Sequence, residues 1–320
     1  MIDATGACSD SCAPLRAPRK RPPRCSDLSE AMGEPLPGTA KPARLFIALE
    51  HSSGWSHDIL DGGVFGGEDT ARIEAWLAER GAALQLIRRP GRLGQIACGG
   101  LAVLVSHCPP DVDGPGGAWL EELVVPDLDA LLGLDIRLGR PTPGARRVHH
   151  PVLLVCTHGK RDVCCAVKGR PMAKYVHDVY PGLVWETSHS KGHRFAPTMI
   201  LLPGNYSYGR IPREETVRVL EAAAEGRLDP AGCRGRGTWS PQGQVAELAV
   251  RAEVGAWGLD DVVRAVHDPG ASDRCEVVLA DGRRFRVGLE RTVTEGIIAS
   301  CGDEPGPKKG WRAVAVEELG

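Results

Sequence analysis

Apolar residues occur in this 320-residue chain as short runs that are no longer than a β-strand. Residues 152–156 and 199–202 are two such runs, and stretches with helical spacing separate many of them. A membrane helix needs about 20 consecutive apolar residues, so the sequence indicates no membrane association. Strands that alternate with helices predict an α/β fold with parallel strand pairing.

The first half of the chain contains three strand-like runs and two helical patterns. The expected strands are at 45–49, 84–87 and 101–105, and the expected helices at 68–80 and 118–134. The next part begins with a strand and a helix, continues with three strands and ends with a helix. These elements are expected at 152–155, 171–179, 183–186, 198–202, 206–211 and from Pro212 onward. This β-α-β-β-β-α order predicts a thioredoxin-like unit, and Ala196-Pro197 is similar to the cis-proline turn of that fold.

Changes in composition divide the chain into four expected regions. The expected fold class is α/β, with a thioredoxin-like domain between a second α/β unit and a small α+β appendage. The regions are a disordered, basic, proline-rich tail at 1–24, an α/β domain without cofactor at 25–150, the thioredoxin-like domain at 151–226 and the appendage at 227–320. In the appendage we expect helices near 245–254 and 259–267, a hairpin at Asp281-Gly282 and a strand at 311–316. No internal sequence repeat is visible.

Charge and cysteine content limit the classes of function. The formal net charge is -2, so the sequence predicts no nucleic-acid binding. The 11 cysteines are an odd number, and the N-terminus has no apolar stretch typical of a signal peptide. We therefore expect a cytoplasmic protein whose cysteines are thiols or metal ligands. Cys8, Cys12, Cys98, Cys108, Cys233, Cys275 and Cys301 are expected to be free or buried thiols without partners.

One segment combines two cysteines and two histidines at regular spacing. Cys156 and Cys165 form a C-x8-C pair, and 23 residues separate it from the H-x3-H pair of His189 and His193. Cys156 ends a buried strand, Cys165 precedes a helix, and the histidines precede the next strand. Both pairs should therefore emerge on loops at the same end of one sheet. Two thiolates and two imidazoles could hold zinc or a [2Fe–2S] cluster.

The same segment resembles the sucrase/ferredoxin-like family. The resemblance covers residues 25 to about 226 and includes Cys25-Ser-Asp-Leu, Pro37-Gly-Thr-Ala40, Trp185-Glu, His193-Arg-Phe-Ala and Tyr208-Gly-Arg210. It implies a thioredoxin-like [2Fe–2S] ferredoxin of the bis-histidinyl, non-Rieske branch. Cys156 and Cys165 would bind one iron, and His189 and His193 the other. Ser190-Lys191-Gly192 departs from the expected, more glycine-rich H-x-G-G-H.

The resemblance and the ligand set imply an electron carrier rather than a stand-alone enzyme. Two thiolates carry less negative charge than four, so a higher potential than in plant-type ferredoxins is expected. A second imidazole nitrogen can gain or lose a proton, which predicts proton-coupled one-electron transfer. The expected partners are redox proteins, including a flavin-dependent reductase. We assign no catalytic residue.

Neighbouring residues have less specific interpretations. His158, Arg161, Cys164 and Arg194 are candidates for contacts around the ligands, although Cys164 also suits a spare thiol and the arginines suit surface salt bridges. A structural zinc site in a binding protein is an alternative that uses the same four ligands. A thiol oxidoreductase that uses Cys164 or Cys165 is another, which the absence of a C-x-x-C motif there disfavours.

Overall fold

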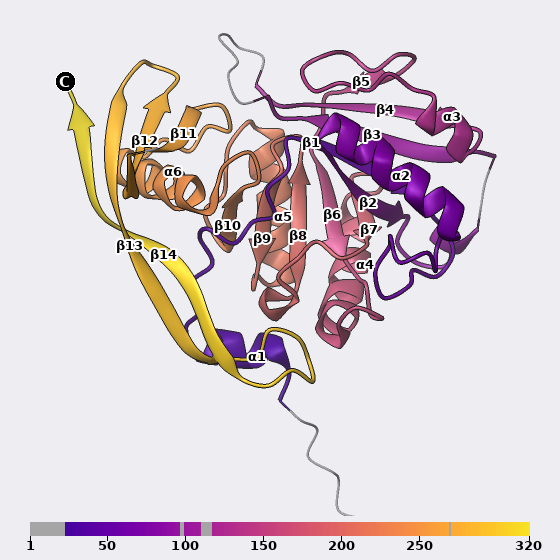
Figure 1. The fold of residues 1–320 in the computed structure, drawn as a ribbon, viewed down its shortest axis with the longest axis horizontal. Coiled ribbons are helices and arrows are strands. Elements are labelled where there is room, and N and C mark those ends of the chain that lie inside the picture. The colour runs from indigo at the N-terminus through magenta and orange to yellow at the C-terminus, as the bar shows by residue number, and fades with distance from the viewer. Residues whose placement is uncertain (1–22, 97–98, 110–116, 269) are drawn as a thin grey trace, which may run out of the picture.

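The computed structural model describes residues 23–96, 99–109, 117–268 and 270–320. The expected tail, with Cys8 and Cys12, falls almost wholly outside these residues, and so does Cys98. The described part contains a ten-stranded mixed sheet with helices and a separate four-stranded antiparallel sheet (Figure 1). This arrangement confirms the predicted α/β class. Among the described residues, no helix has the length and apolar character needed to cross a membrane.

The large sheet consists of two units that repeat one order of elements. The first unit comprises β1 (Leu45–Glu50), α2 (Gly67–Arg80), β2 (Ala82–Arg88), β3 (Leu101–His107), β4 (Trp119–Val125) and α3 (Leu128–Leu132). The second comprises β6 (Val152–Cys156), α4 (Arg170–Val179), β7 (Val184–Thr187), β8 (Thr198–Leu202), β9 (Tyr206–Gly209) and α5 (Arg213–Ala224). In each unit the first two strands are parallel and the next two are antiparallel. The second unit therefore has the predicted thioredoxin-like order, and the first unit has it as well.

The two units join through strand pairing and a shared apolar cluster. Strands β2 and β7 pair antiparallel through Ile87 with Thr187 and Arg88 with Glu186. Apolar side chains of both units, including Phe46 and Leu154, form one buried cluster. Two short strands extend the sheet at its outer edges, namely β5 (Arg146–Val148) beside β4 and β10 (Cys233–Arg236) beside β9. The sheet thus continues across the expected domain boundary at residue 150.

The C-terminal region forms a second sheet and a long arm. Helix α6 (Pro241–Val254) packs against β11 (Val262–Asp268), β12 (Ala271–Leu279), β13 (Arg284–Ile297) and β14 (Gly306–Leu319). Strands β13 and β14 stay paired beyond the other two, down to Ile297 opposite Gly306. In Figure 1 this β13–β14 arm reaches α1 (Cys25–Ala31) at the far end of the molecule. Helix α1 also contacts the short 3-10 helix η3 (His193–Phe195).

Most expected strands and helices are confirmed, including the hairpin at Asp281-Gly282. The Ala196-Pro197 peptide bond, whose isomer the sequence does not determine, is cis. Two predicted helices are wrong. Residues 118–134 contain strand β4 and only a short helix, because β4 pairs along its whole length with β3 and this pairing overrides local helical spacing. Residues 259–267 contain strand β11, where a register shift between Val262 and Arg264 breaks the alternation that marks a strand.

Candidate metal centre

Cys156 lies at the carboxyl end of β6 and is fully buried. The side chains of Cys165 and His189 and the backbone N–H groups of His158 and Ser190 all influence the ionisation of its thiol. The hydrogen bond from Cys165 is the main reason that the pKa of Cys156 lies well below the usual range of a thiol, although burial opposes this. The same bond, together with burial, raises the pKa of Cys165. Of the two thiols, Cys156 therefore loses its proton more readily than Cys165.

A π-helical turn, η2 (Cys165–Gly169), places Cys165 against the end of β6. Such turns are rare and often occur at functional sites. Gly169 ends the turn, and a Cβ atom at this position would lie 2.0 Å from the carbonyl oxygen of Cys156. Only glycine allows the turn to approach the strand so closely, and this approach brings the two sulfurs together.

His189 follows β7 and His193 begins η3, so both histidines come from the loop between β7 and β8. Their ring centroids are 5.1 Å apart, with a 34° angle between the ring planes. The Nδ1 atom of His189 and both ring nitrogens of His193 are buried without a hydrogen-bond partner. Buried polar atoms without a partner are costly, so these nitrogens fit metal ligands better than structural side chains. Burial is also the main reason that the pKa of His193 is lowered.

The loop between the histidines departs from the glycine-rich pattern at Lys191. This residue has φ 64°, in the left-handed region that favours glycine, and Gly192 follows with φ 78°. The buried guanidinium of Arg234 donates to the Lys191 carbonyl at 3.1 Å and to the Thr39 hydroxyl at 3.0 Å. Arg234 therefore ties the histidine loop to the Pro37–Ala40 segment and holds Lys191 in a conformation that costs about 1–2 kcal/mol.

The other expected neighbours, His158, Arg161 and Arg194, form hydrogen bonds with different partners. His158 Nδ1 accepts a hydrogen bond from the His189 backbone N–H at 3.2 Å, and its Nε2 donates to the Ser56 carbonyl at 2.6 Å. His158 thus positions the His189 backbone. Arg161 bonds to His57 Nδ1 at 3.1 Å. Arg194 donates to both carboxylate oxygens of Glu34, at 2.7 and 2.9 Å.

Cys164 points away from Cys165 into a second group of sulfurs, the Cys25–Cys301 cluster, which consists of Cys25, Asp162, Cys164 and Cys301. Its Sγ atom lies 3.5 Å from that of Cys25 and 3.3 Å from that of Cys301, and the sulfurs of Cys25 and Cys301 are 3.6 Å apart. One ligand atom from each of the four residues lies within 4.8 Å of all the others, so the cluster could hold a metal ion. The prediction that Cys301 has no partner is wrong, whereas Cys108, Cys233 and Cys275 are buried thiols as expected.

Asp162 connects this cluster to the histidines. One carboxylate oxygen accepts from the Cys164 N–H at 2.8 Å, and the other accepts from the Ser300 hydroxyl at 2.9 Å and the Cys301 N–H at 2.8 Å. Although burial opposes ionisation, the backbone N–H groups of Cys301 and Cys164 lower the pKa of Asp162 to about 2. The same carboxylate lies 3.8 Å from Nε2 of His193. Asp162 therefore fixes the tip of the β13–β14 arm beside His193, which is only 8% exposed.

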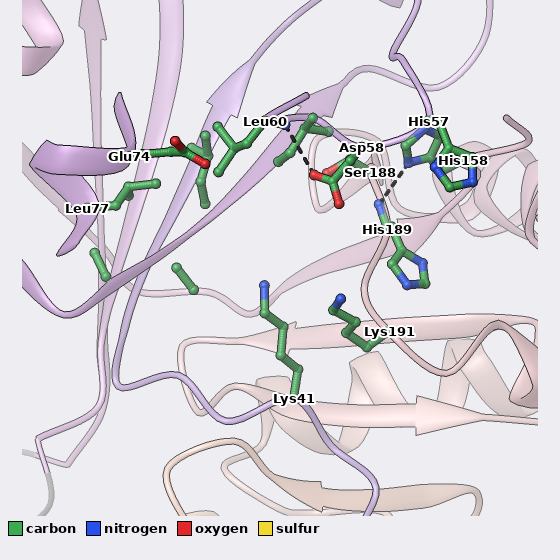
Figure 2. A pocket seen from close by; sticks show the side chains of 14 residues that line it. Lys41, His57, Asp58, Leu60, Glu74, Leu77, His158, Ser188, His189 and Lys191 are labelled. Carbon is green, nitrogen blue, oxygen red and sulfur yellow. Dashed lines mark hydrogen bonds between the residues drawn. The ribbon is translucent and has the colours of Figure 1, made fainter. Parts of the chain in front are cut away.

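A pocket of about 370 Å³ lies on the other side of the site and is lined in part by His189 and His158. Figure 2 shows Lys41 and Lys191 extending into it, with Asp58 beyond them. Burial and the charge of Lys191 lower the pKa of Lys41. His189 thus borders a pocket lined by two lysines and by Asp58 and Glu74, whereas His193 lies under the arm.

Comparison with known proteins gives one match. A family model described as sucrase/ferredoxin-like matches residues 36–235. No curated protein and no solved structure matches the chain. The matched range includes Cys156, Cys165, His189 and His193, but Cys25 and Cys301 lie outside it.

Proposed function

Because the chain belongs to the sucrase/ferredoxin-like family, we propose that Cys156, Cys165, His189 and His193 hold a [2Fe–2S] cluster and that the protein carries single electrons. The observation that carries this proposal is a pair of buried, interacting cysteine thiols beside two imidazoles whose buried nitrogens have no hydrogen-bond partner. Mixed sulfur and imidazole ligation suits such a cluster, as in Rieske centres. When bound, the cluster supplies one-electron redox chemistry.

The residues around the sulfurs favour the charged ligand form. The side chain of Cys165 and the backbone N–H groups of His158 and Ser190 lower the pKa of Cys156, which favours the thiolate that a metal ligand needs. Hydrogen bonds to sulfur and the number of thiolates both set the potential of such a site. With two thiolates instead of four, this site carries less negative charge, which favours a potential above that of plant-type ferredoxins.

The histidines give the site a place to hold a proton. A metal-binding imidazole uses one ring nitrogen, and its other nitrogen can gain or lose a proton. His189 borders the pocket that Lys41 and Lys191 line, so its ring has a route to solvent. We propose on this basis that electron transfer is coupled to proton transfer at His189.

The pocket also suggests how the protein meets its partners. Lys41 and Lys191 provide positive charge beside His189, which suits an acidic group on a docking protein. We propose a flavin-dependent reductase as the electron donor and the cytoplasm as the compartment. The acceptor would use the same face, because electron transfer requires a short distance to the site.

Anaerobic purification followed by iron and acid-labile sulfide analysis tests the proposal. We expect equal amounts of iron and sulfide and a brown protein. The His189→Cys and His193→Cys variants should keep the cluster and lower its potential by on the order of 100 mV, because each adds a thiolate. His149→Cys, at an exposed position, is the control and should leave the potential unchanged. Iron-free protein with zinc bound to these four residues would instead support the structural zinc alternative.

A further inference from the structure

We propose that the Cys25–Cys301 cluster is a second metal site that binds one Zn²⁺ ion and fastens the N-terminal helix and the C-terminal arm to the protein core. Its ligands would be the sulfurs of Cys25, Cys164 and Cys301 and one carboxylate oxygen of Asp162. This site goes beyond the proposed electron-transfer function and does not depend on it. Two of its cysteines lie outside the part of the chain that the family model matches.

The distances suit a single tetrahedral ion. Zinc binds sulfur at about 2.3 Å, so two sulfurs on one tetrahedral zinc are about 3.8 Å apart. The three sulfur–sulfur distances here are 3.3, 3.5 and 3.6 Å. Oδ1 of Asp162, which accepts one hydrogen bond from the Cys164 N–H, lies 3.7 Å from the Cys25 sulfur. Shifts of a few tenths of an ångström would therefore complete the coordination.

A disulfide explains the arrangement less well. A disulfide joins two sulfurs at about 2.05 Å and would leave the third sulfur and the carboxylate without a role. Here each sulfur lies at a similar distance from the two others, and an ionised carboxylate faces them. A divalent cation would offset the negative charge of the thiolates and the carboxylate. Three uncharged thiols would leave the charge of the carboxylate without compensation. An iron–sulfur cubane fits poorly as well, because each of its thiolates binds a different iron and the sulfurs lie further apart.

Hydrogen bonds around the cluster are those expected for thiolate ligands. The Cys25 N–H donates to the Cys301 sulfur at 3.5 Å, and the neighbouring Ser26 lowers the pKa of Cys164. Such bonds from the surrounding chain orient metal ligands and stabilise their charge. Cys25 and Ser26 both belong to α1. This helix therefore provides one ligand, Cys25, and also interacts with the other two cysteines, Cys164 and Cys301.

The ion would connect three segments that are far apart in the sequence. Cys25 and Cys301 are separated by 276 residues, and Cys164 directly precedes the π-helical turn that begins at Cys165. Zinc would therefore hold α1 and the tip of the β13–β14 arm together (Figure 1), and the ligand Asp162 lies 3.8 Å from Nε2 of His193. The second site would keep that histidine out of solvent while His189 stays open to the pocket.

Zinc and iron analysis of the full-length protein tests this inference. We expect about one zinc ion per chain in protein purified without added metal. Cys25→Ser and Cys301→Ser should each weaken zinc binding by more than about 100-fold, because losing even an outer partner of a ligand costs roughly 10- to 100-fold. Cys233→Ser removes a buried cysteine elsewhere and should keep the zinc. His189→Ala should keep it too, which separates this site from zinc bound at the proposed iron ligands.

Cobalt substitution provides a readout on the wild-type protein if a variant fails to fold. Co²⁺ bound here should give intense thiolate charge-transfer bands, and X-ray absorption of the zinc form should show three sulfur ligands and one oxygen ligand. A zinc-free wild-type protein with no cobalt–thiolate bands would overturn the inference. So would zinc that persists in the Cys25→Ser/Cys301→Ser double variant, or a disulfide among these cysteines in freshly purified protein.

Discussion

At the scale of single residues, the proposed cluster ligands depend on one close contact between two chain segments. Gly169 lies against the Cys156 carbonyl, and the turn that it ends carries Cys165. Gly169 has only a hydrogen atom in place of a side chain. The turn can therefore lie close enough to the strand for the two sulfurs to interact. The geometry of the site is therefore sensitive to the backbone at Gly169 as well as to the ligands.

The Gly169→Ala variant should lose both stability and iron. Its Cβ atom would lie 2.0 Å from a backbone oxygen, so the turn must move away from β6. We expect a loss of about 1–3 kcal/mol in the free energy of unfolding, measured by urea denaturation, and a lower iron content. Gly67→Ala is the matched control, because a Cβ atom there meets open space. Unchanged iron content in Gly169→Ala would show that the close approach is not needed.

His107 predicts how stability depends on pH. Its ring is fully buried, stacks on Trp119 at 4.6 Å and lies 3.3 Å from the Glu121 carboxylate. Burial lowers the pKa of His107 more than Glu121 raises it, so the folded state binds this proton less readily than the unfolded state. The contribution of His107 to stability should therefore be present above its unfolded pKa of about 6.5 and be lost as the pH falls through that value.

Urea denaturation of the wild type and of His107→Gln between pH 5 and pH 8 measures this effect. As the pH is lowered, the free energy of unfolding of the wild-type protein should fall more than that of the variant. The reason is that the variant has no proton to bind at this position. A difference that stays constant or grows toward pH 5 would show that the ion pair with Glu121 outweighs burial.

At the scale of elements, the ligands occur in only one of two similarly built units. Both units have the order β-α-β-β-β-α, yet β6 ends at Cys156, whereas β1 ends at Glu50, whose carboxylate accepts from the Ala102 N–H at 3.1 Å. The sequence shows no repeat because the two units share strand order and direction rather than residues. Short apolar runs were sufficient to predict most strands, but long-range pairing decided β4 and β11, where local spacing was misleading.

A buried ion pair attaches α6 to the large sheet. Arg251 bonds to Glu247 at 3.0 Å and to the Tyr206 hydroxyl on β9 at 3.0 Å, and both charged side chains are fully buried. Arg251→Met should lower the free energy of unfolding by about 3–5 kcal/mol, because it leaves a buried carboxylate without its partner. Arg283→Met breaks an exposed pair with Asp281 and should cost less than about 1 kcal/mol. Similar losses in the two variants would contradict this role for the buried pair.

At the scale of the whole molecule, α1 and the β13–β14 arm form a cover over one side of the site. Removing zinc with a chelator should loosen both, since they share the proposed ion. Hydrogen exchange should speed up in α1 and at residues 297–306 while α4 stays protected. Equal exchange with and without zinc would mean that the hydrogen bonds of Asp162 hold the cover without a metal.

This architecture explains which parts of the site the sequence could predict. Cys156, Cys165, His189 and His193 lie at or after the carboxyl ends of two parallel neighbouring strands, so local patterns were enough to place them together. Cys25 and Cys301 meet Cys164 only because the arm crosses the molecule to reach α1. Nothing in the spacing of residues 25, 164 and 301 indicates that contact, and so the second cluster could not be predicted.

Pulsed EPR of the dithionite-reduced protein tests the mixed cysteine–histidine ligation most directly. The account predicts a paramagnetic di-iron centre with nitrogen couplings from two imidazoles, of which one disappears in His189→Cys and the other in His193→Cys. A reduced centre without strong nitrogen couplings, or couplings that persist in both variants, would contradict it.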